Sequence, residues 1–167
     1  MKGTASAKVA IDSDIFFFSL NSSRQDIRPG DVRRLLQHLS SAPSVEIFAS
    51  LSVIGESTIQ CLAGEQKENA RHDLAELHEL IDFWAALGLK FLYPSELVID
   101  ACSRLIARYR QGSRKDYRLS DTDLVHLGYA MAYDMDYFLT TDRALRYYLP
   151  DRSRLNVVDI AGARDLF

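Results

Sequence analysis

The chain has 167 residues, of which 47% are hydrophobic and 26% are charged, and its formal net charge is −3. This composition fits one compact domain and excludes a disordered chain. The acidic balance argues against a protein that coats nucleic acid through bulk charge, although it allows a local basic patch. No apolar run approaches the ~20 residues that a membrane helix needs, so a cytoplasmic protein without a membrane segment is expected.

The first predicted element is a buried strand over residues 8–12, which ends on Asp12. Residues 1–7 are expected to form a flexible leader, and residues 8–167 a single domain. The leader has no apolar core of its own, so it is not a signal peptide. The apolar run continues over residues 15–18, but the strand is expected to stop near the acids.

A helix, a strand and a second helix are predicted next along the chain. Asp31 is a candidate N-cap for the first of these helices, and residues 45–49 form the strand candidate. Ser50 or Ser52 can cap the second helix, which carries Glu56 on an inner turn. An acidic side chain therefore lies on a helix that directly follows a strand.

The middle of the chain shows the clearest helical periodicity. Apolar residues at helical spacing predict a long amphipathic helix over residues 74–87, which Gly88 terminates. Residues 89–93 form a short strand candidate. Ser95 is the expected N-cap of a further helix that runs through Tyr109.

Strands and helices continue to alternate toward the C-terminus. Asp121 or Asp123 is expected to start a helix, residues 137–139 form a strand, and Asp142 starts a short helix. Residues 155–160 form the last predicted strand. This alternation predicts an α/β fold with three α/β/α layers around a largely parallel central sheet.

Four acids stand at predicted strand ends or helix starts, or on a helix near one: Asp12, Glu56, Asp123 and Asp142. Such positions can converge at one edge of an open α/β sheet, where ligand crevices form. Gathered carboxylates would repel each other and raise their pKa values, and Mg²⁺ or Mn²⁺ would relieve that repulsion. Each acid also has a structural alternative, because a single Asp can cap a helix and a single Glu on a helix is usually solvated.

Two further acids accompany this set. Asp14 is separated from Asp12 by one serine. It could hold a metal ligand in place, or it could be a local helix cap. Since one cap suffices for a helix, the pair of Asp121 and Asp123 suggests that Asp121 is also a metal ligand or positions a metal-bound water. His126 lies between apolar residues and is expected to be structural.

Three segments carry a resemblance to a known family. They read VAIDSD at residues 9–14, SLSVIGE at residues 50–56 and DTDLVHLGYAMAYDMDYFLTTD at residues 121–142. Most of the chain resembles the PIN-domain superfamily and, within it, VapC-type toxins. Aligning the helix alanine of that family with Ala130 puts its third acid at Asp123. The chain departs from the usual family pattern with Asp14 in place of Asn, with Gly128 in place of Ala, and in its greater length.

The resemblance implies a parallel sheet covered on both sides and Mg²⁺- or Mn²⁺-dependent cleavage of RNA. Asp12, Glu56, Asp123 and Asp142 would be the catalytic metal ligands, while Ser13 and Thr140 would hydrogen-bond carboxylates or phosphate. An RNA substrate is then expected, with a cognate antitoxin and a homodimer as further candidate partners.

An RNA substrate needs an answering positive surface. The candidate RNA-binding residues follow the helix predicted from Ser95 through Tyr109 or follow the fourth acid, and they are Arg114, Lys115, Arg118 and Arg143. The alternative is that these residues form an ordinary solvated surface. Two other functions compete with the nuclease: a non-catalytic PIN-like module that binds RNA or protein, and a phosphatase of the haloacid dehalogenase type, for which no convincing downstream motifs are found.

Overall fold

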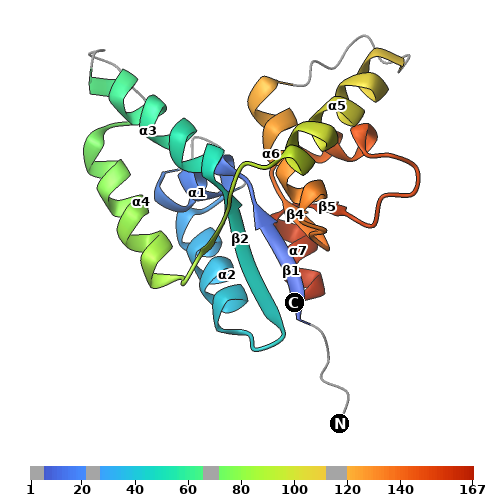
Figure 1. Ribbon diagram of the computed structural model, residues 1–167. Helices are drawn as coiled ribbons and strands as arrows, with labels where there is room; N and C mark the ends of the chain where they lie inside the picture. Colours follow the sequence, from blue (N-terminus) through green and yellow to red (C-terminus); the bar gives the residue numbers. More distant parts are fainter. Residues whose placement is uncertain (1–5, 22–26, 66–71, 112–119) are drawn as a thin grey trace.

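The computed structural model describes residues 6–21, 27–65, 72–111 and 120–167 (Figure 1). At its centre is one five-stranded sheet in which the strand order is β3-β2-β1-β4-β5 and every pairing is parallel. The strands are Ala7–Ile11 (β1), Val45–Ser50 (β2), Lys90–Leu92 (β3), Tyr137–Leu139 (β4) and Asn156–Val158 (β5). Helices in the connections make this arrangement possible, because parallel neighbours require a crossover.

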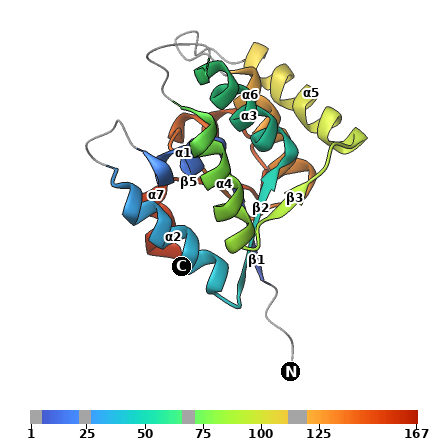
Figure 2. The same cartoon turned by 90° about the vertical axis from the view of Figure 1, so that its left-hand side faces the viewer.

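Helices cover both faces of the sheet. They are Ser13–Leu20 (α1), Pro29–Ser41 (α2), Leu51–Glu65 (α3), Leu74–Ala86 (α4), Glu96–Gln111 (α5), Asp121–Ala132 (α6), the 3₁₀ helix Arg143–Tyr148 (η1) and Ile160–Leu166 (α7). In Figure 1, α3 and α4 stand on one side of the sheet and α5 and α6 on the other, and Figure 2 looks onto the side that α2 and α4 cover. None of the described helices combines the length and apolar character that a membrane crossing requires.

The alternation of side chains along β1 separates two apolar cores. Val9 and Ile11 face the core that includes residues of α1, α2, α4 and α7, whereas Ala10 faces the core built with α5, α6 and η1. On β4, Phe138 and Leu139 divide in the same way. The predicted α/β fold with helices on both sides of a largely parallel sheet is confirmed.

Two helices depart from the predicted elements. The apolar run over residues 15–18 lies in α1, because Asp12 leaves the strand and caps that helix, accepting the Ser13 N–H at 2.8 Å. Near the C-terminus, Asp159 caps α7 and accepts the Gly162 N–H, so the last strand stops at Val158. Both helices are short, with eight and seven residues, and too few turns are present for a helical period to show in the sequence.

The predicted N-cap at Asp31 is wrong, whereas the helix expected to start at Asp121 or Asp123 does begin at Asp121. Helix α2 begins at Pro29 with Arg28 at its N-cap, which puts Asp31 in the first turn. Ser120 caps α6 and accepts the Asp123 N–H at 3.1 Å, so neither acid is needed as a cap. Strand β1 begins at Ala7, inside the predicted leader, and residues 1–5 lie outside the described residues.

Gly128 of α6 packs closely against Cys102 of α5. A Cβ atom at this position would lie 2.4 Å from the Cys102 Sγ and 3.5 Å from the Cys102 backbone nitrogen. The Cys102 thiol thus occupies the space that the usual alanine methyl would need. The departure from the family pattern at Gly128 is explained by packing against this thiol.

We expect Gly128→Ala to lower the free energy of unfolding by about 1–3 kcal/mol, because the new methyl overpacks this contact. Combining Gly128→Ala with Cys102→Ala should recover part of that loss, because the thiol is removed. Urea denaturation of the wild type, both single variants and the double variant gives the coupling energy. Additive effects of the two substitutions would contradict the packing account.

Candidate active site

One cavity of about 190 Å³ lies at the edge of the sheet where the strands end, and all four predicted acids line it. The acids are Asp12, Glu56, Asp123 and Asp142, and they are joined there by Ser13, Asp14 and Thr140. Asp121, also predicted as a metal ligand, does not line the cavity and is exposed, so the structure does not bring it together with the other four acids. The sequence therefore places four acids and three further polar residues in the right region, whereas Asp121 lies on another face of α6.

The central strands bring two of the acids together. Ile11 pairs with Leu139 in the β1–β4 register, and the Asp12 N–H donates to the Leu139 carbonyl at 3.0 Å. Asp12 follows β1 directly, and Asp142 follows β4 after two threonines. Glu56 arrives from the second turn of α3 and Asp123 from the first turn of α6.

His126, which was expected to be structural, is buried between two of the acids. Its ring is 2% exposed, with Nδ1 2.8 Å from Asp12 Oδ1 and Nε2 3.6 Å from Glu56 Oε2. Burial lowers the pKa of His126, but the hydrogen bond and charge of Asp12, with the charges of Glu56 and Asp123, raise it above its ordinary value. The one signal in the sequence is spacing, because His126 is three residues after Asp123 and so shares its helix face.

Among the described residues, three buried polar atoms at or beside the cavity have no hydrogen-bond partner: Asp14 Oδ1, Glu56 Oε2 and His126 Nε2, the last two lying 3.6 Å apart. An unpaired buried polar atom is costly, so these atoms are places where a cation or a proton would be stabilising. The carboxylate oxygens are ligands of the type that Mg²⁺ and Mn²⁺ prefer. In the described part of the chain, however, no three acidic, histidine or cysteine side chains are arranged as a metal-binding group. The His126 ring lies between Asp12 and Glu56.

Asp14 joins the cavity to the loop after β4. Its Oδ2 accepts hydrogen bonds from the Thr141 N–H at 3.0 Å and from the Thr141 hydroxyl. Burial, followed by the charge of Asp12, raises the pKa of Asp14 to about 7. Burial also raises the pKa of Asp123, with Asp12 adding to it. The expected upward shifts are present, but loss of hydration contributes more than repulsion between the acids.

The remaining predicted polar residues have identifiable roles. The Thr140 hydroxyl accepts the Asp142 N–H at 3.1 Å, and Asp142 Oδ1 accepts the Ala144 N–H at 2.8 Å. Thr140 thus supports the backbone that carries Asp142, although the prediction gave it a carboxylate or phosphate partner. Gln60, which the sequence analysis missed, donates from Nε2 to Glu56 Oε1 at 2.9 Å.

Of the predicted RNA-binding residues, only Arg143 falls in the described part of the chain. It pairs with Asp159 at the start of α7 and lines a second cavity. The others, Arg114, Lys115 and Arg118, lie outside the described residues.

Several solved structures share this architecture at low sequence identity. VapBC2 from Rickettsia felis, bound to a DNA fragment from their promoter, gives a TM-score of 0.65 at 14% identity over 91% of this chain and 98% of that one. The chain has a VapC-like PIN-domain fold. VapBC-1 from nontypeable Haemophilus influenzae gives a TM-score of 0.62 at 12% identity, over 92% of this chain and 98% of that one. VapC20 from Mycobacterium tuberculosis, a toxin that cleaves the sarcin-ricin loop, gives a TM-score of 0.54 at 14% identity. The match covers 83% of this chain and 92% of that one.

No family model and no curated protein sequence matches the chain. At 12–14% identity, the likeness to VapC structures establishes the PIN-domain fold alone. The activity must be argued from the cavity.

We expect Asp14→Asn to change how stability depends on pH. In the folded protein the Asp14 pKa is about 7, above its unfolded value of 3.8, so wild-type stability falls as pH rises between those values. The asparagine variant lacks this contribution, and its stability relative to wild type should rise from pH 4 to pH 8. Urea melts in chelator at several pH values test this, and a constant difference would contradict the raised pKa.

Proposed function

We propose that this chain is an Mg²⁺- or Mn²⁺-dependent endoribonuclease and the toxin of a toxin–antitoxin pair. The observation that carries the proposal is the single cavity lined by Asp12, Glu56, Asp123 and Asp142 at the carboxyl edge of a parallel sheet. The buried Glu56 Oε2, which accepts no hydrogen bond from the described residues, supports a cation site there. The VapC-like fold supports the choice of RNA as substrate, since one of the similar structures is a toxin that cleaves the sarcin-ricin loop.

In the proposed mechanism the four acids hold the metal and the chain supplies its surroundings. A bound Mg²⁺ or Mn²⁺ would lower the pKa of a water molecule and neutralise charge that develops on the phosphate. Asp14 fixes the loop that carries Asp142 through its two hydrogen bonds to Thr141. His126 Nδ1 and the Ser13 N–H both contact Asp12 Oδ1, each at 2.8 Å, and so fix this carboxylate. The raised pKa of His126 favours the protonated ring near the acids.

The partners belong to the same proposal. An antitoxin that covers the cavity would hold the nuclease in check, and a homodimer and a cytoplasmic location are further expectations. The complexes VapBC2 and VapBC-1 support an antitoxin as the first partner to seek. Co-expression with the product of an adjacent gene, followed by co-purification, is the direct way to find it.

We expect Asp12→Asn and Asp142→Asn each to reduce cleavage of labelled RNA in Mn²⁺ by more than about 100-fold, because each removes a charge from the metal site. The matched control is Asp121→Asn, which removes an acid on α6 that does not line the cavity. Time courses on denaturing gels, with and without chelator, provide the measurement. Cleavage at the wild-type rate by Asp12→Asn would leave a non-catalytic RNA- or protein-binding module as the better account.

Metal should also stabilise the folded protein. At a Mn²⁺ concentration 100 times its Kd, mass action adds about 2.7 kcal/mol, or roughly 5–10 °C in Tm for a chain of this size. We expect this rise for wild type and a much smaller one for Asp12→Asn, because the variant lacks a ligand charge. Scanning calorimetry across a wide range of Mn²⁺ concentrations measures it, and an unchanged wild-type Tm would count against the metal site.

A further inference from the structure

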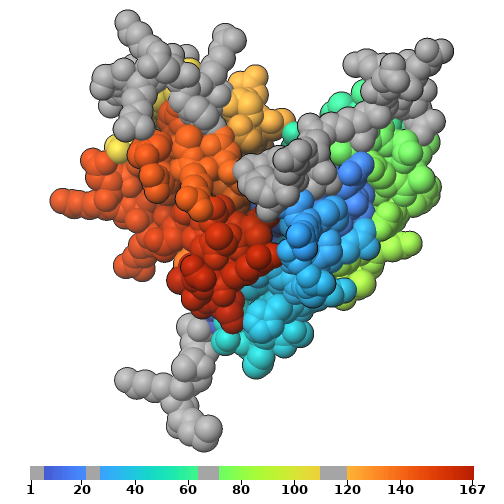
Figure 3. All heavy atoms as spheres, turned by 180° about the vertical axis from the view of Figure 1, so that it is seen from behind, coloured from blue at the N-terminus to red at the C-terminus, as the bar shows by residue number. Residues whose placement is uncertain are grey.

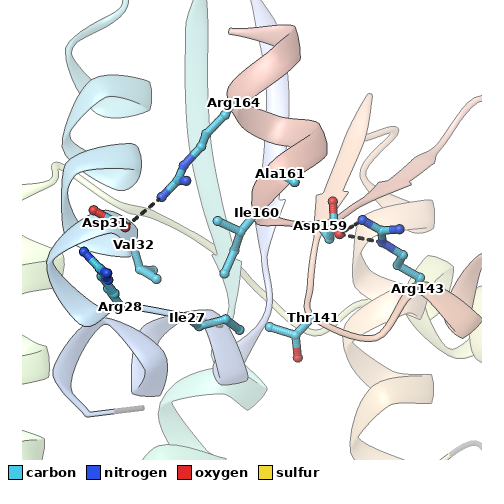
Figure 4. A pocket seen from close by; sticks show the side chains of 10 residues that line it. All are labelled: Ile27, Arg28, Asp31, Val32, Thr141, Arg143, Asp159, Ile160, Ala161 and Arg164. Carbon is cyan, nitrogen blue, oxygen red and sulfur yellow. Dashed lines mark hydrogen bonds and ion pairs between the residues drawn. The ribbon is translucent and has the colours of Figure 1, made fainter. Parts of the chain in front are cut away.

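A second cavity, of about 260 Å³, lies beside the acidic one and carries arginines from three separate segments (Figure 4). Arg28 comes from the start of α2, Arg143 from η1 and Arg164 from α7. Figure 3 shows α7, in red, lying against α2, in light blue, on this face of the molecule. We call this cavity the arginine pocket.

We propose that the arginine pocket binds a backbone phosphate of the RNA strand, next to the phosphodiester held at the acidic cavity. This inference rests on the proposed function for its substrate. The two cavities share a wall, because Thr141 lines the arginine pocket and donates two hydrogen bonds to Asp14, which lines the acidic cavity. An RNA strand that enters one cavity therefore passes the other.

The charges of the arginine pocket leave a net positive site. Its two acids are already engaged, since Asp159 pairs with Arg143 and accepts the Gly162 N–H, and Asp31 pairs with Arg34 and lies 3.7 Å from Arg164. Arg28 has no ion pair within the described residues. Three guanidinium groups thus face two carboxylates across the cavity, and Arg28 is the group left to receive an anion.

The backbone adds to this preference for an anion. Helix α2 has 13 residues, and no side chain caps its N-terminus, where Arg28 and Asp31 line the pocket. The positive end of the helix dipole therefore favours a negative group at this place. Between the charged sides, Ile27, Val32 and Ile160 form an apolar wall, seen in Figure 4, against which a ribose can pack.

The position in the sheet distinguishes this pocket from the other arginines. Asp142 and Thr141 follow β4 and Asp159 follows β5, so both cavities lie at the carboxyl edge of the sheet. Arg152 and Arg154 instead line a cavity with Asp136, before β4 and β5, at the opposite edge. These two exposed arginines are matched controls for bulk charge, because they lie at the edge of the sheet opposite the acidic cavity.

Binding of a fluorescein-labelled, mixed-sequence single-stranded RNA 12-mer tests the proposal by anisotropy, in chelator, over a series of salt concentrations. Each of Arg28→Ala and Arg164→Ala should weaken binding several-fold and lower the slope of log K against log salt by about 0.7, the value for one phosphate contact on a single strand. Arg28→Lys should restore most of the slope, and Arg152→Ala should leave it unchanged. Thermal melts of every variant establish that it is folded.

Unchanged slopes for both Arg28→Ala and Arg164→Ala would overturn the proposal, as would an equal loss for Arg152→Ala. Arg28→Ala and Arg164→Ala could instead lose binding to a poly-glutamate peptide and keep their binding to the RNA. That result would overturn the proposal and make an acidic protein segment the better ligand for the arginine pocket. The measurement stays separate from the cleavage assay. If wild type fails to cleave RNA in Mn²⁺ but the slopes fall as expected, the phosphate site stands and the nuclease does not.

Discussion

The parallel pairing of β1 with β2 on one side and β4 on the other is the constraint on which both cavities depend. Parallel strands deliver the residues that follow them to one edge of the sheet. Because Ile11 pairs with Leu139, Asp12 and the segment of Thr140 to Asp142 leave the sheet as neighbours. A slip of one residue in this register would exchange the two faces of β1, and the apolar residues that now fill both cores would be misplaced.

The acidic cavity is held together at an electrostatic cost. Burial is the first cause of the raised pKa values of Asp14 and Asp123, so these side chains lose hydration that the fold only partly replaces. His126 compensates within the chain, because its ring lies between Asp12 and Glu56 and its pKa is raised by their charges. Strongly shifted pKa values in a cleft are typical of functional sites. The buried acids that lower the stability of the fold are also groups that can bind a cation.

One contact links the acidic cavity to the arginine pocket. Asp14, which stands where the family often has Asn, accepts both the N–H and the hydroxyl of Thr141. That contact fixes the loop between β4 and η1, which carries Asp142 toward one cavity and Arg143 toward the other. The edge of the sheet thus presents negative and positive groups side by side, an arrangement that suits a metal ion together with a phosphate chain.

The sequence by itself determined the alternation of strands and helices and the positions of the four acids relative to them. These features are local, because a strand is read from a run of apolar residues and a strand-end acid from its place in that run. Helix α1 was missed for the same reason: its residues are apolar nearly all round, and only the cap at Asp12 distinguishes it from a longer strand. The N-cap positions of Arg28 and Ser120 are also hard to predict, because several neighbouring residues could occupy the N-cap of each helix.

The tertiary structure alone decided which side chains meet. His126 reaches Asp12 across 114 positions of sequence, and Arg28 shares a cavity with Arg164 although they lie at opposite ends of the chain. Asp121 and Asp123 look equivalent in the sequence, but two residues of helix turn one side chain toward the cavity and the other toward solvent. Such contacts follow from how helices far apart in sequence pack on one sheet, and no local pattern encodes that packing.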